Sequence, residues 1–131
     1  MSVAEILRRK CLSDKARSII MEVLPVEDQD HSCLMLEYEG FYLQIAFSEL
    51  HPMIVVYLAR GLVRPSSYKD KQLVNNINLK SVLGSHAIND EVGCYSFHSA
   101  HWLDKELSKE RFFEILTRCT EEATYAYKCF H

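Results

Sequence analysis

The sequence predicts an α+β domain in which helices pack on an antiparallel sheet. Two observations carry this prediction: apolar residues follow helical spacing at both ends of the chain, and the middle alternates apolar with other residues between short turns. The expected order is helix, three strands, helix, two strands, helix (α-β-β-β-α-β-β-α). With 131 residues, the chain has the length of one ordinary domain, which we place at residues 1–131.

The first 24 residues have helical character. Ser2 and Glu5 have the spacing of a capping box, which favours a helix start at this point. The apolar residues that follow form two sets, and the phase of the second set does not continue that of the first. Ser13 and Asp14 stand at the junction in the manner of an N-cap, so we expect two helical pieces or one helix with an irregular joint.

Three strands are expected after a polar loop at residues 27–32. They are Cys33–Tyr38, Phe41–Phe47 and Met53–Ala59. Gly40 between the first two strands suits a tight hairpin. Alternation sets Tyr42 and Gln44 opposite the apolar face of the second strand. The third strand is apolar on both faces, so its second face is covered within the chain or by a partner.

The second half of the chain is expected to hold a short helix, two strands and a long helix. Asp70 stands as the N-cap of the short helix, and the strands are expected at Ser81–Ile88 and Val92–His98. The long helix starts after Ser108 and carries an apolar stripe at three- and four-residue spacing. The stripe consists of Phe112, Ile115, Leu116, Cys119, Ala123, Ala126 and Phe130.

Composition argues against several classes of function. Fifteen Lys and Arg against 18 Asp and Glu give a net charge of −3, whereas nucleic-acid binding favours a basic surface. The longest apolar run, Met53–Ala59, is too short to cross a bilayer. The first residues lack the apolar core of a secretory signal, and five widely spaced cysteines suit a reducing compartment. We therefore expect a cytoplasmic protein without a nucleic-acid or membrane partner.

No familiar catalytic motif occurs in the sequence, neither a P-loop nor a nucleophile elbow nor a His-Glu-x-x-His helix. His98 and His101, near His86 and Cys94, form the one cluster that resembles a metal site. Cys94 and His98 lie roughly 13 Å apart along an extended strand, too far for shared ligation. We therefore expect no catalytic residue, metal or cofactor. An enzyme would need His98 and His101 to converge on a cleft.

Seven tyrosines and one tryptophan are more than a small core usually needs. Tyrosines opposite the core face can form a binding platform, because a rigid ring with a hydroxyl suits interfaces. The alternative is that helices cover both faces of the sheet at these positions. Another arrangement is a ligand pocket enclosed by Tyr95, Phe97 and Trp102, which would indicate a small-ligand sensor.

The stretch from Leu73 to Phe112 resembles the YbjN-like family. The resemblance rests on Leu73-Val74-Asn75-Asn76-Ile77-Asn78, Gly84, Asp90, Gly93-Cys94-Tyr95-Ser96-Phe97 and Trp102-Leu103-Asp104. These small bacterial proteins are described as sensory transduction regulators, and their fold is similar to that of class I type III secretion chaperones. The resemblance implies a two-sided binding module that usually dimerises. Such chaperones hold an extended effector segment against apolar patches of the sheet and first helix.

These observations together predict a non-enzymatic module that binds a protein segment, forms a homodimer and has a chaperone-like or regulatory role. Exposed sheet edges and apolar patches favour strand addition or self-association. The residues expected to form the protein-binding surface are Tyr42, Gln44, Val55 and Tyr57.

Overall fold

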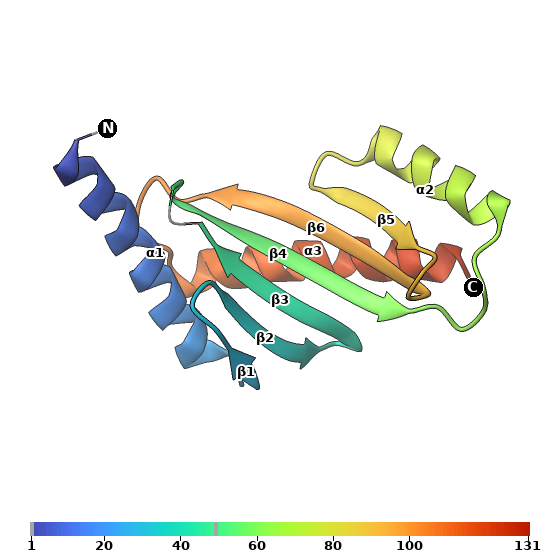
Figure 1. Ribbon diagram of the computed structural model, residues 1–131, viewed down its shortest axis with the longest axis horizontal. Helices are drawn as coiled ribbons and strands as arrows, with labels where there is room; N and C mark the ends of the chain where they lie inside the picture. Colours follow the sequence, from blue (N-terminus) through green and yellow to red (C-terminus); the bar gives the residue numbers. More distant parts are fainter. Residues whose placement is uncertain (1, 49) are drawn as a thin grey trace.

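The computed structural model describes residues 2–48 and 50–131 (Figure 1). Its elements are α1 (Val3–Val23), β1 (Asp28–Gln29), β2 (Cys33–Tyr38), β3 (Phe41–Phe47), β4 (Met53–Gly61), α2 (Tyr68–Lys80), β5 (Ser85–Asn89), β6 (Cys94–Trp102) and α3 (Lys109–Cys129). The predicted α+β class and element order are confirmed. The two-residue β1 is an addition, which lies within residues 27–32, where a polar loop without a strand was expected.

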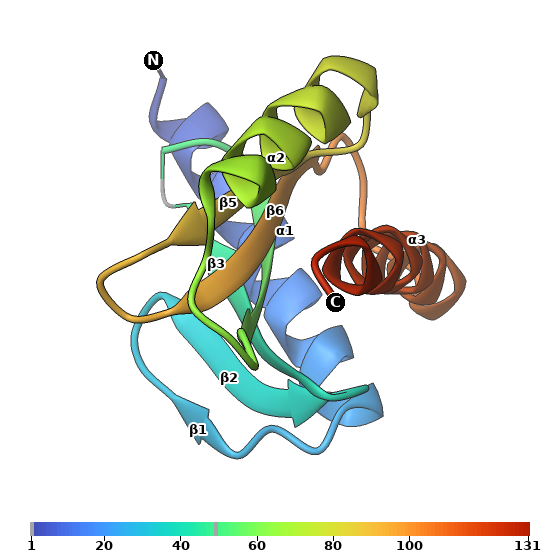
Figure 2. The ribbon, with the colours of Figure 1, turned by 90° about the vertical axis from the view of Figure 1, so that its right-hand side faces the viewer.

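The strands form one antiparallel sheet with the order β1-β2-β3-β4-β6-β5. Helix α3 runs along one face of the sheet, α1 crosses one end of it, and α2 lies beside β5 (Figures 1 and 2). The core fills the space between the sheet and α3. Its largest fully buried side chains include Tyr95, Phe41, Phe97, Phe112, Phe130 and Ile20. In the part of the chain that the structure describes, no helix covers the other face, which we call the open face.

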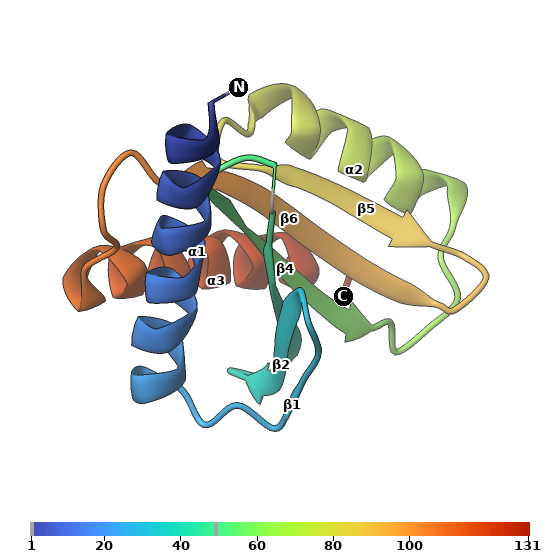
Figure 3. The same ribbon diagram turned by 60° about the vertical axis from the view of Figure 1, so that its left-hand side comes forward.

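Helix α1 is continuous, so the expected joint at Ser13 and Asp14 is absent. Ser13 is buried in the middle of the helix, where its hydroxyl donates to the Ser48 carbonyl at 3.4 Å. The two apolar sets differ in phase because they face different surroundings. The buried positions of α1 are Leu12, Ser13, Ala16 and Ile20. The first set stays in solvent, with Val3 73%, Ile6 49% and Leu7 61% exposed. Figure 3 shows the N-terminal turns of α1 at the end of the helix that lies away from β1 and β2.

Serine hydroxyls cap all three helices. Ser2 accepts the Glu5 N–H, while the Glu5 carboxylate pairs with the arginines of the next turn instead of completing a capping box. Ser108 caps α3 as predicted. The predicted N-cap of α2 is wrong by three residues, because Ser67 is the cap and Asp70 is the N3 residue of a complete capping box.

The last two strands differ in length from the prediction. β5 begins only at Ser85, after Gly84, and β6 continues four residues past His98 to Trp102. The extension follows from pairing, because every residue from Cys94 to Trp102 has a partner along the nine residues of β4. No helix among the described residues combines the length and apolar character needed to cross a membrane.

Candidate protein-binding surface

The four residues predicted to bind protein lie together on the open face. Strands β3 and β4 pair so that Gln44 faces Tyr57 and Ala46 faces Val55. Their neighbours in sequence, such as Leu43 and Val56, point to the opposite face and are fully buried. The open-face side chains remain partly accessible, and Tyr42 is 42% exposed.

Hydrogen bonds within the sheet hold the polar groups of this surface. The Tyr42 hydroxyl donates to Oε1 of Gln44 at 3.3 Å, and Nε2 of Gln44 donates to the Cys33 sulfur at 3.2 Å. Partial burial raises the pKa of Tyr42 above its ordinary value, so the hydroxyl is neutral near pH 7. The surface therefore presents ring faces and aliphatic groups without a charge in its centre.

The same register extends this surface across the sheet. Met35 faces Gln44, and Tyr57 lies opposite His98, which in turn faces Ser85. The row of side chains thus crosses five strands. The residues of β4 on this face are partly buried, and no helix of the described residues lies over them (Figure 2). The alternative in which helices cover both faces of that strand is therefore wrong. Its second apolar face is left accessible by the described chain.

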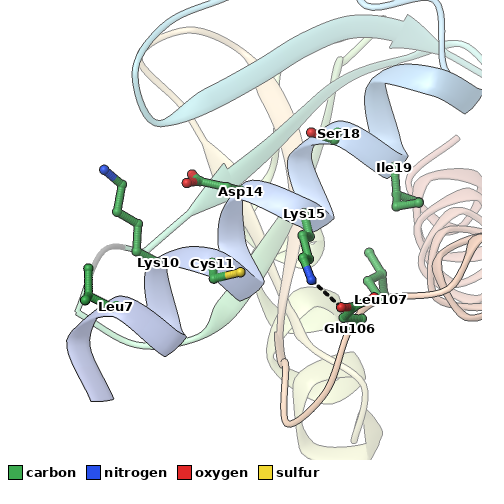
Figure 4. Close-up of a pocket in the computed structure, with 9 residues that line it drawn as sticks. All are labelled: Leu7, Lys10, Cys11, Asp14, Lys15, Ser18, Ile19, Glu106 and Leu107. Atoms are coloured by element: carbon green, nitrogen blue, oxygen red, sulfur yellow. Dashed lines mark hydrogen bonds and ion pairs between the residues drawn. The ribbon is translucent and has the colours of Figure 1, made fainter. Parts of the chain in front are cut away.

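A second accessible apolar surface lies along α1. A groove of about 570 Å³ runs between α1 and the segment that precedes α3 (Figure 4). Leu7, Ile19 and Leu107 contribute its apolar parts, and an ion pair between Lys15 and Glu106 bridges its two sides. The family resemblance implied an apolar patch on the first helix, but no residues were assigned to it from the sequence, although the change of apolar phase within α1 was its signal.

The two edges of the sheet differ in accessibility. Beside β5, the side-chain amide of Asn78 on α2 bonds both backbone groups of His86: Nδ2 donates to the carbonyl at 2.9 Å, and Oδ1 accepts the N–H at 2.8 Å. This amide takes the place of a neighbouring strand, so the β5 edge is blocked at His86. The opposite edge ends in β1, which pairs with only Leu34 and Met35 of β2.

The structure does not gather Tyr95, Phe97 and Trp102 around one pocket. Tyr95 and Phe97 point into the core and are fully buried, whereas Trp102 lies on the opposite face of β6 and is 65% exposed. The parity of strand positions explains the separation, because residues 95 and 97 share a face that residue 102 does not. Tyr95 and Phe97 thus belong to the core, whereas Trp102 belongs to the open face.

The histidines of β6 are likewise separated. His98 is on the open face, and His101 points to the other side, where its Nε2 lies 2.8 Å from the Ser99 hydroxyl and 3.9 Å from the Cys119 sulfur. Burial lowers the pKa of His101 and raises that of the Cys119 thiol. A buried, protonated thiol is a poor nucleophile. Within residues 2–48 and 50–131, no three His, Cys, Asp or Glu side chains are grouped to hold a metal ion.

Known structures share this fold, although comparisons with protein-family profiles and with the sequences of curated proteins find no match. A chain of the HopA1–SchA chaperone–effector complex is 14% identical, with a TM-score of 0.61 over 98% of both chains. YbjN from E. coli, described as a proposed transcription regulator, is also 14% identical, with a TM-score of 0.64 over 87% of both chains.

A third similar structure is that of the Yersinia pestis type III secretion chaperone SycH in complex with a fragment of YscM2. It is 13% identical, with a TM-score of 0.60 over 88% of this chain and 98% of the other. The predicted resemblance to YbjN and to type III secretion chaperones is therefore confirmed at the level of the fold. At this identity, the likeness concerns the fold alone.

Proposed function

We propose that this protein is a non-enzymatic binding module with a chaperone-like or regulatory role, which captures a segment of a partner protein on its apolar sheet and helix surfaces. The observation that carries the proposal is the open face, where Tyr42, Gln44, Val55 and Tyr57 stay accessible on the two central strands. A sheet face of this kind usually packs against another layer, because exposed apolar area is unfavourable in water.

The chemistry of the surface suits a polypeptide ligand. Tyrosine rings bury a large area at a small cost in side-chain entropy, and their hydroxyls donate to carbonyl oxygens of a bound segment. The accessible apolar part of α1, with Val3, Ile6 and Leu7, offers a second contact area. Two of the similar structures, those with SchA and with SycH, have descriptions that name an effector or a bound protein fragment, which supports a protein partner here.

We further propose that the protein acts in the cytoplasm as a homodimer. Two copies provide two open faces and two α1 surfaces, so that a long segment can contact both. The β5 edge is blocked by Asn78, so strand addition is expected at the β1 edge, where pairing is short.

Substituting Tyr57→Asp tests the proposal, because it places a charge at the centre of the open face. We expect weakened self-association in size-exclusion chromatography with light scattering, or loss of partner proteins in co-purification followed by mass spectrometry. The far-UV circular dichroism of the helices should be retained. Tyr42→Lys, at the more exposed end of the same surface, should act in the same direction.

Tyr125→Asp is the matched control, since Tyr125 is exposed on α3 away from the sheet. It should leave both self-association and partner capture unchanged. The proposal is wrong if the wild type is a monomer without a partner. It is also wrong if folded Tyr57→Asp and Tyr42→Lys proteins elute and co-purify as the wild type does.

A further inference from the structure

A separate pocket of about 280 Å³ lies between α2 and the C-terminal part of α3, away from the open face. Its walls include Leu73 and Ile77 of α2 and Tyr125 and Ala126 of α3. The volume is just below the range of about 300–1,000 Å³ found for ligand sites, so the pocket suits only a small molecule. The pocket is mostly apolar, with polar groups gathered at one place.

The polar groups form a chain of hydrogen bonds that starts in the core. The Tyr95 hydroxyl lies 2.7 Å from Nδ1 of His86, and Nε2 of His86 lies 3.3 Å from Oε1 of Glu122. The same oxygen accepts the Ser81 hydroxyl at 2.6 Å. Burial lowers the pKa of His86 and raises that of Tyr95, so both are neutral near pH 7.

Because Tyr95 and His86 are neutral, the donor of each hydrogen bond in this network can be assigned. Tyr95 donates to Nδ1 of His86, and the remaining proton of the imidazole, on Nε2, points to Glu122. Both Ser81 and His86 thus bond one oxygen of the carboxylate. The second oxygen, Oε2 of Glu122, is buried and has no hydrogen-bond partner among residues 2–48 and 50–131. A buried carboxylate oxygen without a donor is costly and uncommon in folded proteins.

No lysine or arginine among the described residues lies within ion-pair distance of Glu122. The one basic side chain at that distance is His86, which is neutral. Lys80 lines the pocket but is itself exposed to solvent, where its charge is screened. Glu122 is therefore an acceptor with spare capacity beside an apolar cavity. Rotation of its terminal torsion, which is broad for carboxylates, can turn either oxygen toward the cavity.

We propose that this pocket binds a small ammonium compound with an apolar body, whose N–H groups bond the Glu122 carboxylate while the body packs between α2 and α3. The apolar walls match the body of such a ligand, and the partnerless oxygen of Glu122 matches its ammonium group, while His86 and Ser81 bond the other oxygen. The inference is independent of the protein-binding function, because the open face contributes nothing to this site.

The experiment titrates the full chain with 2-phenylethylammonium chloride at pH 7 and follows the heat of binding by calorimetry. We expect saturable binding to the wild type. Glu122→Gln should weaken it at least about tenfold, because the amide lacks the charge that strengthens the hydrogen bond. The uncharged ligand 2-phenylethanol should bind the wild type at least about tenfold more weakly for the same reason.

Glu121→Gln is the matched control, since this neighbouring carboxylate is exposed, and it should leave the affinity unchanged. Asn76→Trp, an exposed substitution at the pocket wall, should abolish binding by filling the cavity without touching Glu122. The proposal is overturned if the wild type gives no saturable heat at millimolar probe. It is equally overturned if Glu122→Gln or Asn76→Trp binds as the wild type does, or if 2-phenylethanol binds as tightly as the amine.

Discussion

A single guanidinium connects the start of α2 to the end of α3. Arg64 donates to both carboxylate oxygens of Asp70, at 2.7 and 3.0 Å, and to the Phe130 carbonyl at 2.7 Å. Asp70 also accepts the Ser67 N–H at 2.9 Å, which completes the capping box. Bidentate pairs of this kind are stronger than ordinary surface ion pairs because their geometry is fixed. Two helices that are distant in sequence are thereby held at one point.

The Asp70 pair makes the stability depend on pH in the acid range. Its hydrogen bonds with Arg64 lower the pKa of Asp70 from 3.8 to about 2. Since the folded-state pKa is the lower one, the stabilisation is complete above about pH 4 and is lost as the pH falls toward 2. We expect Asp70→Asn to reduce the free energy of unfolding by about 1–2 kcal/mol at pH 7, a figure discounted for the half-exposed arginine.

Urea denaturation at pH 7 and at pH 2.5 measures this effect. The difference between Asp70→Asn and the wild type should shrink at the lower pH, where the wild-type carboxyl is partly protonated. Asp104→Asn, a change of an exposed carboxylate, should show little cost at either pH. An equal penalty for Asp70→Asn at both pH values would contradict the assignment.

Gly84 is required because the segment before β5 lies very close to β6. A Cβ atom at this position would lie 2.2 Å from the His98 carbonyl oxygen and 2.7 Å from the Phe97 ring. Both neighbours are held by the pairing of β6, so neither can move freely. We expect Gly84→Ala to destabilise the fold by about 1–3 kcal/mol, measured by thermal denaturation.

The control for this prediction is Gly61→Ala at the end of β4, where an added Cβ would meet no atom within 4 Å. It should leave the melting temperature nearly unchanged. Equal melting temperatures for Gly84→Ala and the wild type would show that the segment before β5 is not packed as described.

At the scale of elements, the sequence could predict helices and strands that have a periodic apolar pattern, but not which strands pair. The apolar stripe of α3 is buried throughout because one face of that helix meets the core, so spacing alone located it. The two-residue β1 depends on the register of Asp28 with Met35, which no local pattern reveals. Ser67 and Asp70 both have cap chemistry, and only the backbone shows which of them is the N-cap.

The candidate sites follow the same division. Alternation along each strand predicted which side chains share a face, and so Tyr42 and Gln44 were grouped correctly. Their contact with Tyr57 depends on the β3–β4 register, which only the structure supplies. The His86–Glu122 contact joins positions 36 residues apart, so sequence spacing carried no sign of it. The phase change within α1 was misread as a joint, although it marks an exposed apolar surface.

The whole molecule has an asymmetric build, with the helices on one side of the sheet and at its margins (Figure 2). The core and the network at Arg64 are complete within one chain, whereas the open face and the start of α1 leave apolar side chains in solvent. Large exposed apolar patches are rare on monomeric proteins and usually mark interaction sites. This asymmetry connects the fold to the proposed capture of another polypeptide.

Hydroxyl-radical footprinting with mass spectrometry measures directly whether another polypeptide covers the open face. The assembled protein, isolated as the proposed dimer or with a co-purified partner, is compared with the dilute monomer. We expect Tyr42 and Tyr57 to be oxidised several-fold more slowly in the assembly, while Tyr125 on α3 reacts at the same rate in both. Equal oxidation rates of Tyr42 and Tyr57 in the assembly and in the monomer would contradict the proposed binding surface.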